Sequence, residues 1–110
     1  MSEQDPIVIV GSARTAMGGM QGDFAAVTAP QLGATAIEAA LQRAGINGDD
    51  VDEVIMGNVL GAGQGQAPAR QASKGAGIPD AVGATTINKM CGSGMKAAMF
   101  GHDLLVAGSA

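Results

Sequence analysis

The order of apolar and polar positions predicts alternating strands and helices. Short runs rich in apolar, β-branched residues are typical of buried strands, and we expect three strands, at residues 7–10, 51–60 and 84–90. Apolar residues that recur every three to four positions indicate helices, and we expect three, at residues 28–44, 67–76 and 93–107. The order β-α-β-α-β-α predicts parallel strands joined by helical crossovers, and hence the α/β fold class.

The helix ends carry recognisable local signals. Thr28 is a suitable N-cap, Gln31 follows it at the spacing of a capping box, and Pro30 is tolerated in the first turn. Gly45 is placed to end this helix in the left-handed conformation, and Gly108 has the same place after residues 93–107.

The helix at residues 93–107 is apolar almost all round. Its apolar residues are Met95, Ala97, Ala98, Met99, Phe100, Leu104, Leu105, Val106 and Ala107. A helix of this kind is normally buried on every side, and three short strands with two other helices are too few to cover it. The alternation also calls for another strand after this helix. We therefore expect residues 1–110 to form part of a larger domain.

Composition and charge exclude several classes of function. The chain has 110 residues, 46% of them hydrophobic, and a net charge of −4. Its basic residues are scattered, so we expect no nucleic-acid or anionic-lipid surface. No apolar run approaches the length of about 20 residues that a membrane span needs, and the acidic N-terminus lacks the apolar core of a secretory signal. A single cysteine excludes an intrachain disulfide, so a reduced thiol and a cytoplasmic location are expected.

That cysteine, Cys91, lies between the strand at 84–90 and the helix at 93–107. The first turn of a helix has unpaired N–H groups and a partial positive charge, which favour the thiolate over the thiol. Gly92 and Gly94 leave room for an acyl group, and backbone N–H groups there are placed to stabilise an oxyanion. The setting favours acyl transfer through a thioester. The alternative interpretation is a small thiol buried in the core.

Several spaced motifs then indicate a family. The run NKMCGSGMKA at residues 88–97 resembles the active-site signature of the thiolases of the acetyl-CoA C-acetyltransferase type. The runs SART at 12–15, GNVL at 57–60 and GQAPARQ at 65–71 resemble other parts of the same family, in the same order. The resemblance therefore extends over nearly the whole chain.

The resemblance implies a fold and a reaction. The fold would be the N-terminal portion of the layered α/β/α/β/α architecture, and the family forms homodimers or homotetramers. Cys91 would attack acetyl-CoA, form an acyl-thioester and pass the acyl group to a second acetyl-CoA. In the reverse direction, CoA would cleave acetoacetyl-CoA or a longer 3-ketoacyl-CoA. Coenzyme A thioesters are substrates here, so no cofactor is implied, and the backbone N–H of Cys91 is a candidate for the oxyanion hole. A role in lipid metabolism is also implied.

The family's other catalytic groups lie in its C-terminal half. They are an activating histidine, a second cysteine and an asparagine-held water, and none of them is matched here. The one histidine, His102, is eleven residues from Cys91, about three turns along a helix, and is interpreted as a helix-surface or packing residue. We therefore expect the 110-residue chain to be inactive alone. The alternatives are a truncated, non-catalytic fragment, a related condensing enzyme of the ketoacyl-synthase type, and a redox protein with a reactive thiol.

Other conspicuous residues have simpler interpretations. The glycines of 61–65 lack the lysine and hydroxyl residue of a phosphate-binding loop, so we expect a flexible loop beside the active site. The acidic residues within 49–53 have no histidine or cysteine near them, so we expect a solvated turn and no metal site. Ser93 lacks the spacing of a hydrolase nucleophile and is interpreted as a helix cap. Arg70 and Lys74 are expected at the surface or at a subunit contact.

Overall fold

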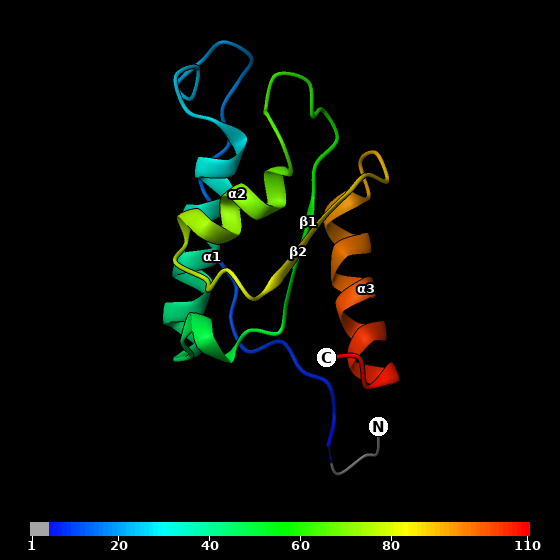
Figure 1. Cartoon of the computed structure of the whole chain (residues 1–110). Coiled ribbons are helices and arrows are strands. Elements are labelled where there is room, and N and C mark those ends of the chain that lie inside the picture. Colours follow the sequence, from blue (N-terminus) through cyan, green and yellow to red (C-terminus); the bar gives the residue numbers. More distant parts are fainter. Residues whose placement is uncertain (1–4) are drawn as a thin grey trace.

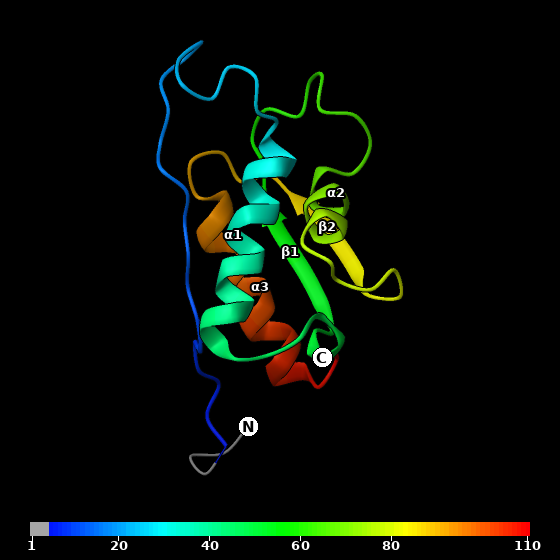
Figure 2. The ribbon, with the colours of Figure 1, turned by 90° about the vertical axis from the view of Figure 1, so that its left-hand side faces the viewer.

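The computed structural model describes residues 5–110 and shows a two-stranded sheet between helices (Figure 1). Its elements are, in order, α1 (Ala29–Ala44), the 3₁₀ turn η1 (Gly48–Asp50), β1 (Glu53–Gly57), α2 (Pro68–Gly75), β2 (Gly83–Ile87) and α3 (Ser93–Ala107). Helices α1 and α2 lie on one side of the sheet and α3 lies on the other (Figures 1 and 2). The α/β class is therefore confirmed, with the chain arranged in three layers.

The two strands pair in parallel, as predicted. Glu53 lies opposite Gly83 at one end of the ladder, and Gly57 lies opposite Ile87 at the other. Both strands are shorter than the apolar runs that predicted them, because the chain leaves the ladder soon after these residues. Asn58 still donates its N–H to the carbonyl of Ile87, at 2.9 Å, and the two chains then separate into loops.

The strand predicted at residues 7–10 is wrong. This segment belongs to neither strand of the sheet, and its side chains are open to solvent, with Ile9 90% exposed. The chain just after it packs on α1 instead: a Cβ at Gly11 would lie 2.7 Å from the carbonyl oxygen of Ala40, and Arg43 Nη1 donates to the carbonyl of Ser12 at 2.8 Å. An apolar, β-branched run favours the strand conformation, but a strand also needs a partner for its backbone.

The predicted ends of α1 are confirmed. The N–H of Gln31 donates to Thr28 Oγ1 at 3.2 Å, and the N–H of Thr28 donates to Gln31 Oε1 at 2.8 Å. This reciprocal pair is the capping box expected from the sequence. At the other end, Gly45 has a φ of 70°, the left-handed conformation that a residue without a Cβ adopts at little cost. Gly108 ends α3 in the same way.

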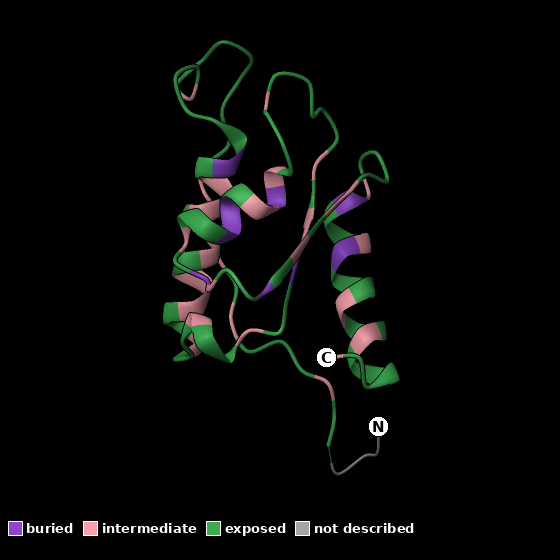
Figure 3. Cartoon of the chain, in the orientation of Figure 1, coloured by how far each residue is buried: buried purple, intermediate pink, exposed green. Residues whose placement is uncertain are grey.

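The core lies between the sheet and the pair α1 and α2 (Figure 3). Its centre consists of Val54, Ile78 and Val82, with Ile37, Leu41, Val51, Met56 and Ala84 packed against it. Small residues bring the two helices together, since a Cβ at Gly75 would lie 3.0 Å from the Cβ of Ala34. The absence of a side chain at Gly75 therefore allows α1 and α2 to pack closely.

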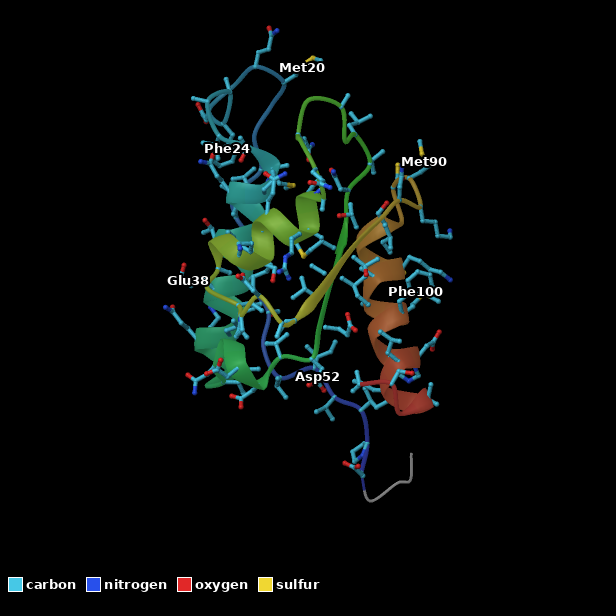
Figure 4. All side chains as sticks on the ribbon, viewed as in Figure 1. Met20, Phe24, Glu38, Asp52, Met90 and Phe100 are labelled. Atoms are coloured by element: carbon cyan, nitrogen blue, oxygen red, sulfur yellow. The ribbon has the colours of Figure 1, made fainter. Side chains whose placement is uncertain are left out.

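Helix α3 packs on β1 along one edge only. Ser93 and Ala97 are its buried residues within the described chain, whereas Met95 is 74% exposed and Met99 is 50% exposed. Figure 4 places Phe100 on the same helix, away from α1 and α2. The sequence predicted that the other strands and helices would be too few to bury this apolar helix. Its exposed side chains confirm this prediction. None of the helices in residues 5–110 has the length and hydropathy needed to cross a membrane.

Candidate active site

The loops that follow β1 and β2 lie together at the carboxyl ends of the strands (Figures 1 and 2). The first is the loop of residues 58–67, and the second is the short connection of residues 88–92 that carries Cys91. In α/β sheets, ligands bind at this end of parallel strands. Cys91 therefore lies where the topology predicts a site.

Cys91 is presented to solvent by a tight turn. The N–H of Gly92 donates to the carbonyl of Lys89 at 3.0 Å, and the N–H of Ser93 donates to the carbonyl of Met90 at 3.1 Å. Met90 has a φ of 47°, a left-handed conformation that residues with a Cβ rarely adopt. The thiol at the tip of this turn is free and exposed. The interpretation of Cys91 as a buried core thiol is therefore wrong.

Side chains on both sides of Cys91 hold this turn. Asn88 Oδ1 accepts the N–H of Met90 at 2.9 Å. Ser93 Oγ accepts the N–H of Lys89 at 2.9 Å and donates its proton to the carbonyl of Met90 at 2.6 Å. Ser93 is thus the first residue of α3 and not its cap, because the N-cap position is taken by Gly92. The predicted cap is wrong: the hydroxyl bonds backwards into the turn and not forwards into the helix.

The start of α3 leaves backbone donors available beside the thiol. After the N–H of Ser93, the next N–H of α3 that bonds to the turn is that of Lys96, which donates to the carbonyl of Gly92 at 2.9 Å. Within residues 5–110, the N–H groups of Cys91 and Gly94 have no such acceptor. Unpaired N–H groups at a helix start attract negative charge. The thiol and these donors are therefore close together at one helix end.

Gly57 fixes how closely α3 approaches the sheet. This last residue of β1 faces the start of α3, and a Cβ on it would lie 2.6 Å from the carbonyl carbon of Ser93 and 2.8 Å from the nitrogen of Gly94. Those separations are shorter than any contact a real Cβ makes. Only glycine allows the backbone of the Cys91 turn to sit directly on the end of β1. The sequence showed Gly57 as part of a family motif, but not this contact.

Amide side chains organise the loop after β1. Asn58 Nδ2 donates to Gln64 Oε1 at 2.9 Å, and Gln71 Nε2 donates to the carbonyls of Gln64 and Gln66, each at 2.8 Å. Asn88 Nδ2 also reaches this loop, where it donates to the carbonyl of Val59 at 3.2 Å. The predicted flexible loop is therefore tied down by side chains. A cluster of amides after two strands is the signal that could have identified these residues.

The remaining candidates stay outside the site. His102 is exposed on α3 and pairs with Asp103, with 3.1 Å between Nδ1 and Oδ1, so the interpretation as a surface residue is confirmed. In the described residues, no group of three or more acidic, histidine or cysteine side chains is placed to hold a metal. Arg70 bonds within the chain, since its Nη1 donates to the carbonyl of Val82 at 2.6 Å and its Nη2 to that of Asp80 at 2.7 Å.

Lys74 on α2 forms a charge pair with Asp80 that lowers the pKa of this carboxyl. Its Nζ lies 2.9 Å from Asp80 Oδ1. The hydrogen bond and the charge of Lys74 hold the pKa of the Asp80 carboxyl below its usual value, and the charge of Arg70 adds to this effect. Both basic residues thus connect α2 to the turn before β2. Their contribution is to the scaffold that supports the site.

The fold and the turn define an α/β protein that presents a cysteine ahead of a helix. Known proteins share both the sequence and the arrangement. The family model for the thiolase N-terminal domain matches the sequence over residues 7–110. An acetyl-CoA acetyltransferase of Cupriavidus necator is 56% identical over 104 residues, which cover 94% of this chain. A mitochondrial acetyl-CoA acetyltransferase of Xenopus tropicalis is 54% identical over 102 residues, which cover 93%.

A solved structure agrees with these relatives. The crystal structure of the Acat5 thiolase from Ascaris suum in complex with coenzyme A superposes with a TM-score of 0.88 and 35% identity, over 91% of this chain. The chain belongs to the thiolase family. It spans about a quarter of the proteins it matches, namely 26% of the C. necator enzyme, 24% of the X. tropicalis enzyme and 26% of the A. suum chain.

Proposed function

We propose that Cys91 is the nucleophile of an acetyl-CoA C-acetyltransferase. The observation that carries the proposal is the exposed thiol on a turn at the start of α3. The Cys91 thiolate would add to the carbonyl carbon of acetyl-CoA and form a carbon–sulfur bond. The bond to the sulfur of coenzyme A then breaks, and coenzyme A leaves as its own thiol after taking up a proton. The acetyl group remains on Cys91 as a thioester.

Backbone donors at the start of α3 support this step. The carbonyl oxygen gains negative charge when the thiolate adds to it, and preorganised N–H groups lower the energy of that charge. The N–H groups of Cys91 and Gly94, which lack acceptors within residues 5–110, are suitably placed at this helix end. We propose the N–H of Cys91 as one donor of the oxyanion hole.

In the second step, a base would take a proton from the methyl group of another acetyl-CoA, and the resulting carbanion would attack the thioester carbonyl on Cys91. The bond from the acetyl carbon to the Cys91 sulfur then breaks, giving acetoacetyl-CoA and the Cys91 thiolate. The family resemblance implies that the base is a second cysteine outside residues 1–110. The reverse reaction would cleave acetoacetyl-CoA, or a longer 3-ketoacyl-CoA, with coenzyme A. Two relatives are named acetyl-CoA acetyltransferases, and the A. suum thiolase is described in complex with coenzyme A. These names support the substrate class proposed for this protein.

Acetyl transfer to Cys91 can be measured directly. The protein is incubated with acetyl-CoA, digested at low pH to preserve thioesters, and analysed by mass spectrometry. We expect one acetyl group on the peptide that contains Cys91 and none in the Cys91→Ala variant. An acetyl group found only on lysines, or an unmodified Cys91, would contradict the proposal. The intact mass of the protein from its source is recorded as well, because it shows whether the native protein is longer than 110 residues.

Acetylation of Cys91 and full turnover need different groups, because the family resemblance implies that turnover also needs an activating histidine. His102, the one histidine, is engaged with Asp103 on the surface of α3, so residues 1–110 offer no histidine for Cys91. We therefore predict that these residues, produced alone, do not catalyse thiolysis of acetoacetyl-CoA. The assay follows loss of acetoacetyl-CoA in the presence of coenzyme A. Turnover that depends on Cys91 would overturn this prediction.

Assembly and location stay predictions. The family resemblance favours a homodimer or homotetramer, and no assembly is described for the relatives above. A cytoplasmic location stays open to test because one relative is described as mitochondrial. A role in lipid metabolism likewise depends on which 3-ketoacyl-CoA the protein uses. Fractionation of source cells, with detection of the Cys91 peptide, would distinguish the two locations.

A further inference from the structure

We propose that Ser93 and Asn88 are positioning residues that hold Met90 in its left-handed conformation and so determine how Cys91 is presented. The inference rests on the proposed role of Cys91 as nucleophile. It concerns residues that do not contact the acyl group themselves. Their effect would pass through one backbone unit, the residue immediately before the thiol.

Met90 is the strained member of the turn. Its φ of 47° lies in the region that favours glycine, and its side chain is 65% exposed, so packing of that side chain does not explain the conformation. A strained backbone conformation persists only where surrounding contacts hold it in place. The cause of the conformation must therefore be sought in hydrogen bonds to the backbone.

Both ends of Met90 are held by side chains. Its N–H donates to Asn88 Oδ1 at 2.9 Å, and its carbonyl accepts the hydroxyl proton of Ser93 at 2.6 Å. The same hydroxyl oxygen accepts the N–H of Lys89 at 2.9 Å. Asn88 thus holds the peptide unit before Met90, and Ser93 holds the peptide unit after it.

The two side chains connect the turn to different elements. Ser93 is the first residue of α3 and is 4% exposed, packed against Gly57 at the end of β1. Asn88 donates to the carbonyl of Val59 and so joins the turn to the loop after β1. Within residues 5–110, Cys91 makes no side-chain hydrogen bond of its own. Its position therefore depends on these neighbours, and small displacements of a reacting atom are costly in rate.

The test uses the protein at the length at which its source makes it. The variants are Ser93→Ala and Asn88→Ala, each alone and combined with Met90→Gly, and the matched control is Ser109→Ala at an exposed serine outside the turn. Three quantities are measured for each: the rate of Cys91 alkylation by iodoacetamide, the kcat and KM for acetyl transfer, and the midpoint of thermal unfolding.

We expect Ser93→Ala and Asn88→Ala to lower kcat by about tenfold to a hundredfold while KM changes little, because misplacing a reacting atom affects the reaction more than binding. Alkylation of Cys91 should slow as well. Glycine adopts the left-handed conformation without the Cβ penalty, so Met90→Gly should restore much of the lost rate. A merely structural role would lower the unfolding midpoint without this rescue. The Ser109→Ala control should match the unmodified protein.

Two results would overturn the inference: unchanged kcat and alkylation in both single variants, or losses that Met90→Gly does not reduce. If Ser93→Ala fails to fold, Asn88→Ala decides, because Asn88 is exposed and its replacement leaves α3 intact. Alkylation needs no thioester, so it separates this inference from the proposed function. Variants that alkylate slowly while the unmodified protein accepts no acetyl group would support positioning and reject acyl transfer.

Discussion

Residue 57 is glycine, and its lack of a side chain allows the Cys91 turn to pack against the end of β1. A Cβ at Gly57 would come within 2.8 Å of the backbone of Ser93 and Gly94, and backbone cannot move aside as a flexible side chain can. Gly57→Ala should therefore push the start of α3 away from β1. We expect a loss of about 1–3 kcal/mol in the free energy of unfolding, as for other overpacked sites, and slower acetyl transfer to Cys91.

The matched control for this substitution is Gly101→Ala. Gly101 lies within α3, and a Cβ there would meet nothing within 4 Å. Alanine favours the helix over glycine by about 0.5–1 kcal/mol, so this variant should be as stable as the unmodified protein or more so. Urea unfolding and acetyl transfer are measured for both. Equal losses in the two variants would show that contact with β1 is not the cause.

The place of Cys91 just before α3 could be predicted from the sequence, whereas the side chains that hold its turn could not. A lone cysteine between an apolar run and a helical pattern, with glycines around it, predicts a thiol at the start of a helix from local features alone, and its role as nucleophile stays a proposal. Asn88 and Ser93 act through Met90, and nothing in the preferences of methionine predicts a φ of 47°. The hydroxyl of Ser93 was misinterpreted for the same reason, since its acceptor is the carbonyl of a residue in an unexpected conformation.

At the scale of elements, the helix ends were predictable because their signals are local. Thr28 and Gln31 satisfy each other's backbone groups over three residues. Thr28→Ala should cost about 1 kcal/mol in the free energy of unfolding, the usual value of an N-cap, measured by urea unfolding. Thr35→Ala is the control, because Thr35 is exposed in the middle of α1 and alanine is the better helix former. A control as destabilised as Thr28→Ala would contradict the capping role.

Strands were less predictable because pairing is not local. The run at residues 7–10 has the composition of a strand, yet the next residues pack on α1 through Gly11 and Ser12. The runs at 51–60 and 84–90 do pair, but over five residues each, since the ladder ends where the two chains diverge. A sequence pattern predicts which segments favour the strand conformation. It does not determine where each finds a partner.

The connection between α2 and β2 should respond to pH through Asp80. The pKa of this carboxyl is lowered by Lys74 and Arg70, so the folded state binds its proton less readily than the unfolded state. The stabilisation is present above the ordinary pKa of aspartate, about 3.9, and is lost as the pH falls through the lower folded value. Asp80→Asn should reduce the acid sensitivity of the urea midpoint below about pH 4.

The effect at Asp80 should be small, because its side chain is 74% exposed and exposed ion pairs contribute little. Asp103→Asn on α3 provides the control, since its partner His102 belongs to another layer. Salt should weaken the Asp80 contribution by screening it. Identical urea midpoints for the Asp80→Asn variant and the unmodified protein at pH 7 and pH 3 would show that this pair contributes nothing measurable.

At the scale of the whole molecule, the two sides of the sheet differ in how well their helices are packed. Helices α1 and α2 share a core with the sheet, whereas α3 leaves a hollow of about 840 Å³ between itself and α1, lined by residues such as Ile37, Ile55, Ala97 and Leu104. Most of α3 is coloured as exposed in Figure 3, and its exposed apolar side chains include Met95, Met99 and Phe100. Exposed apolar side chains gathered on one helix favour association in water.

We therefore expect residues 1–110, produced alone, to associate as their concentration rises. Met95 and Met99 lie one turn apart on α3 and are 74% and 50% exposed. Replacing both by lysine should raise the dissociation constant by about tenfold or more, because a fully buried methionine contributes about 1.5–3 kcal/mol. The control replaces Met17 and Met20 by lysine, since they are 88% and 98% exposed on the segment before α1. Figure 4 shows Met20 far from Phe100 on α3. Sedimentation equilibrium measures both. A monomer at every concentration, or equal effects of the two double variants, would show that the apolar side of α3 does not drive association.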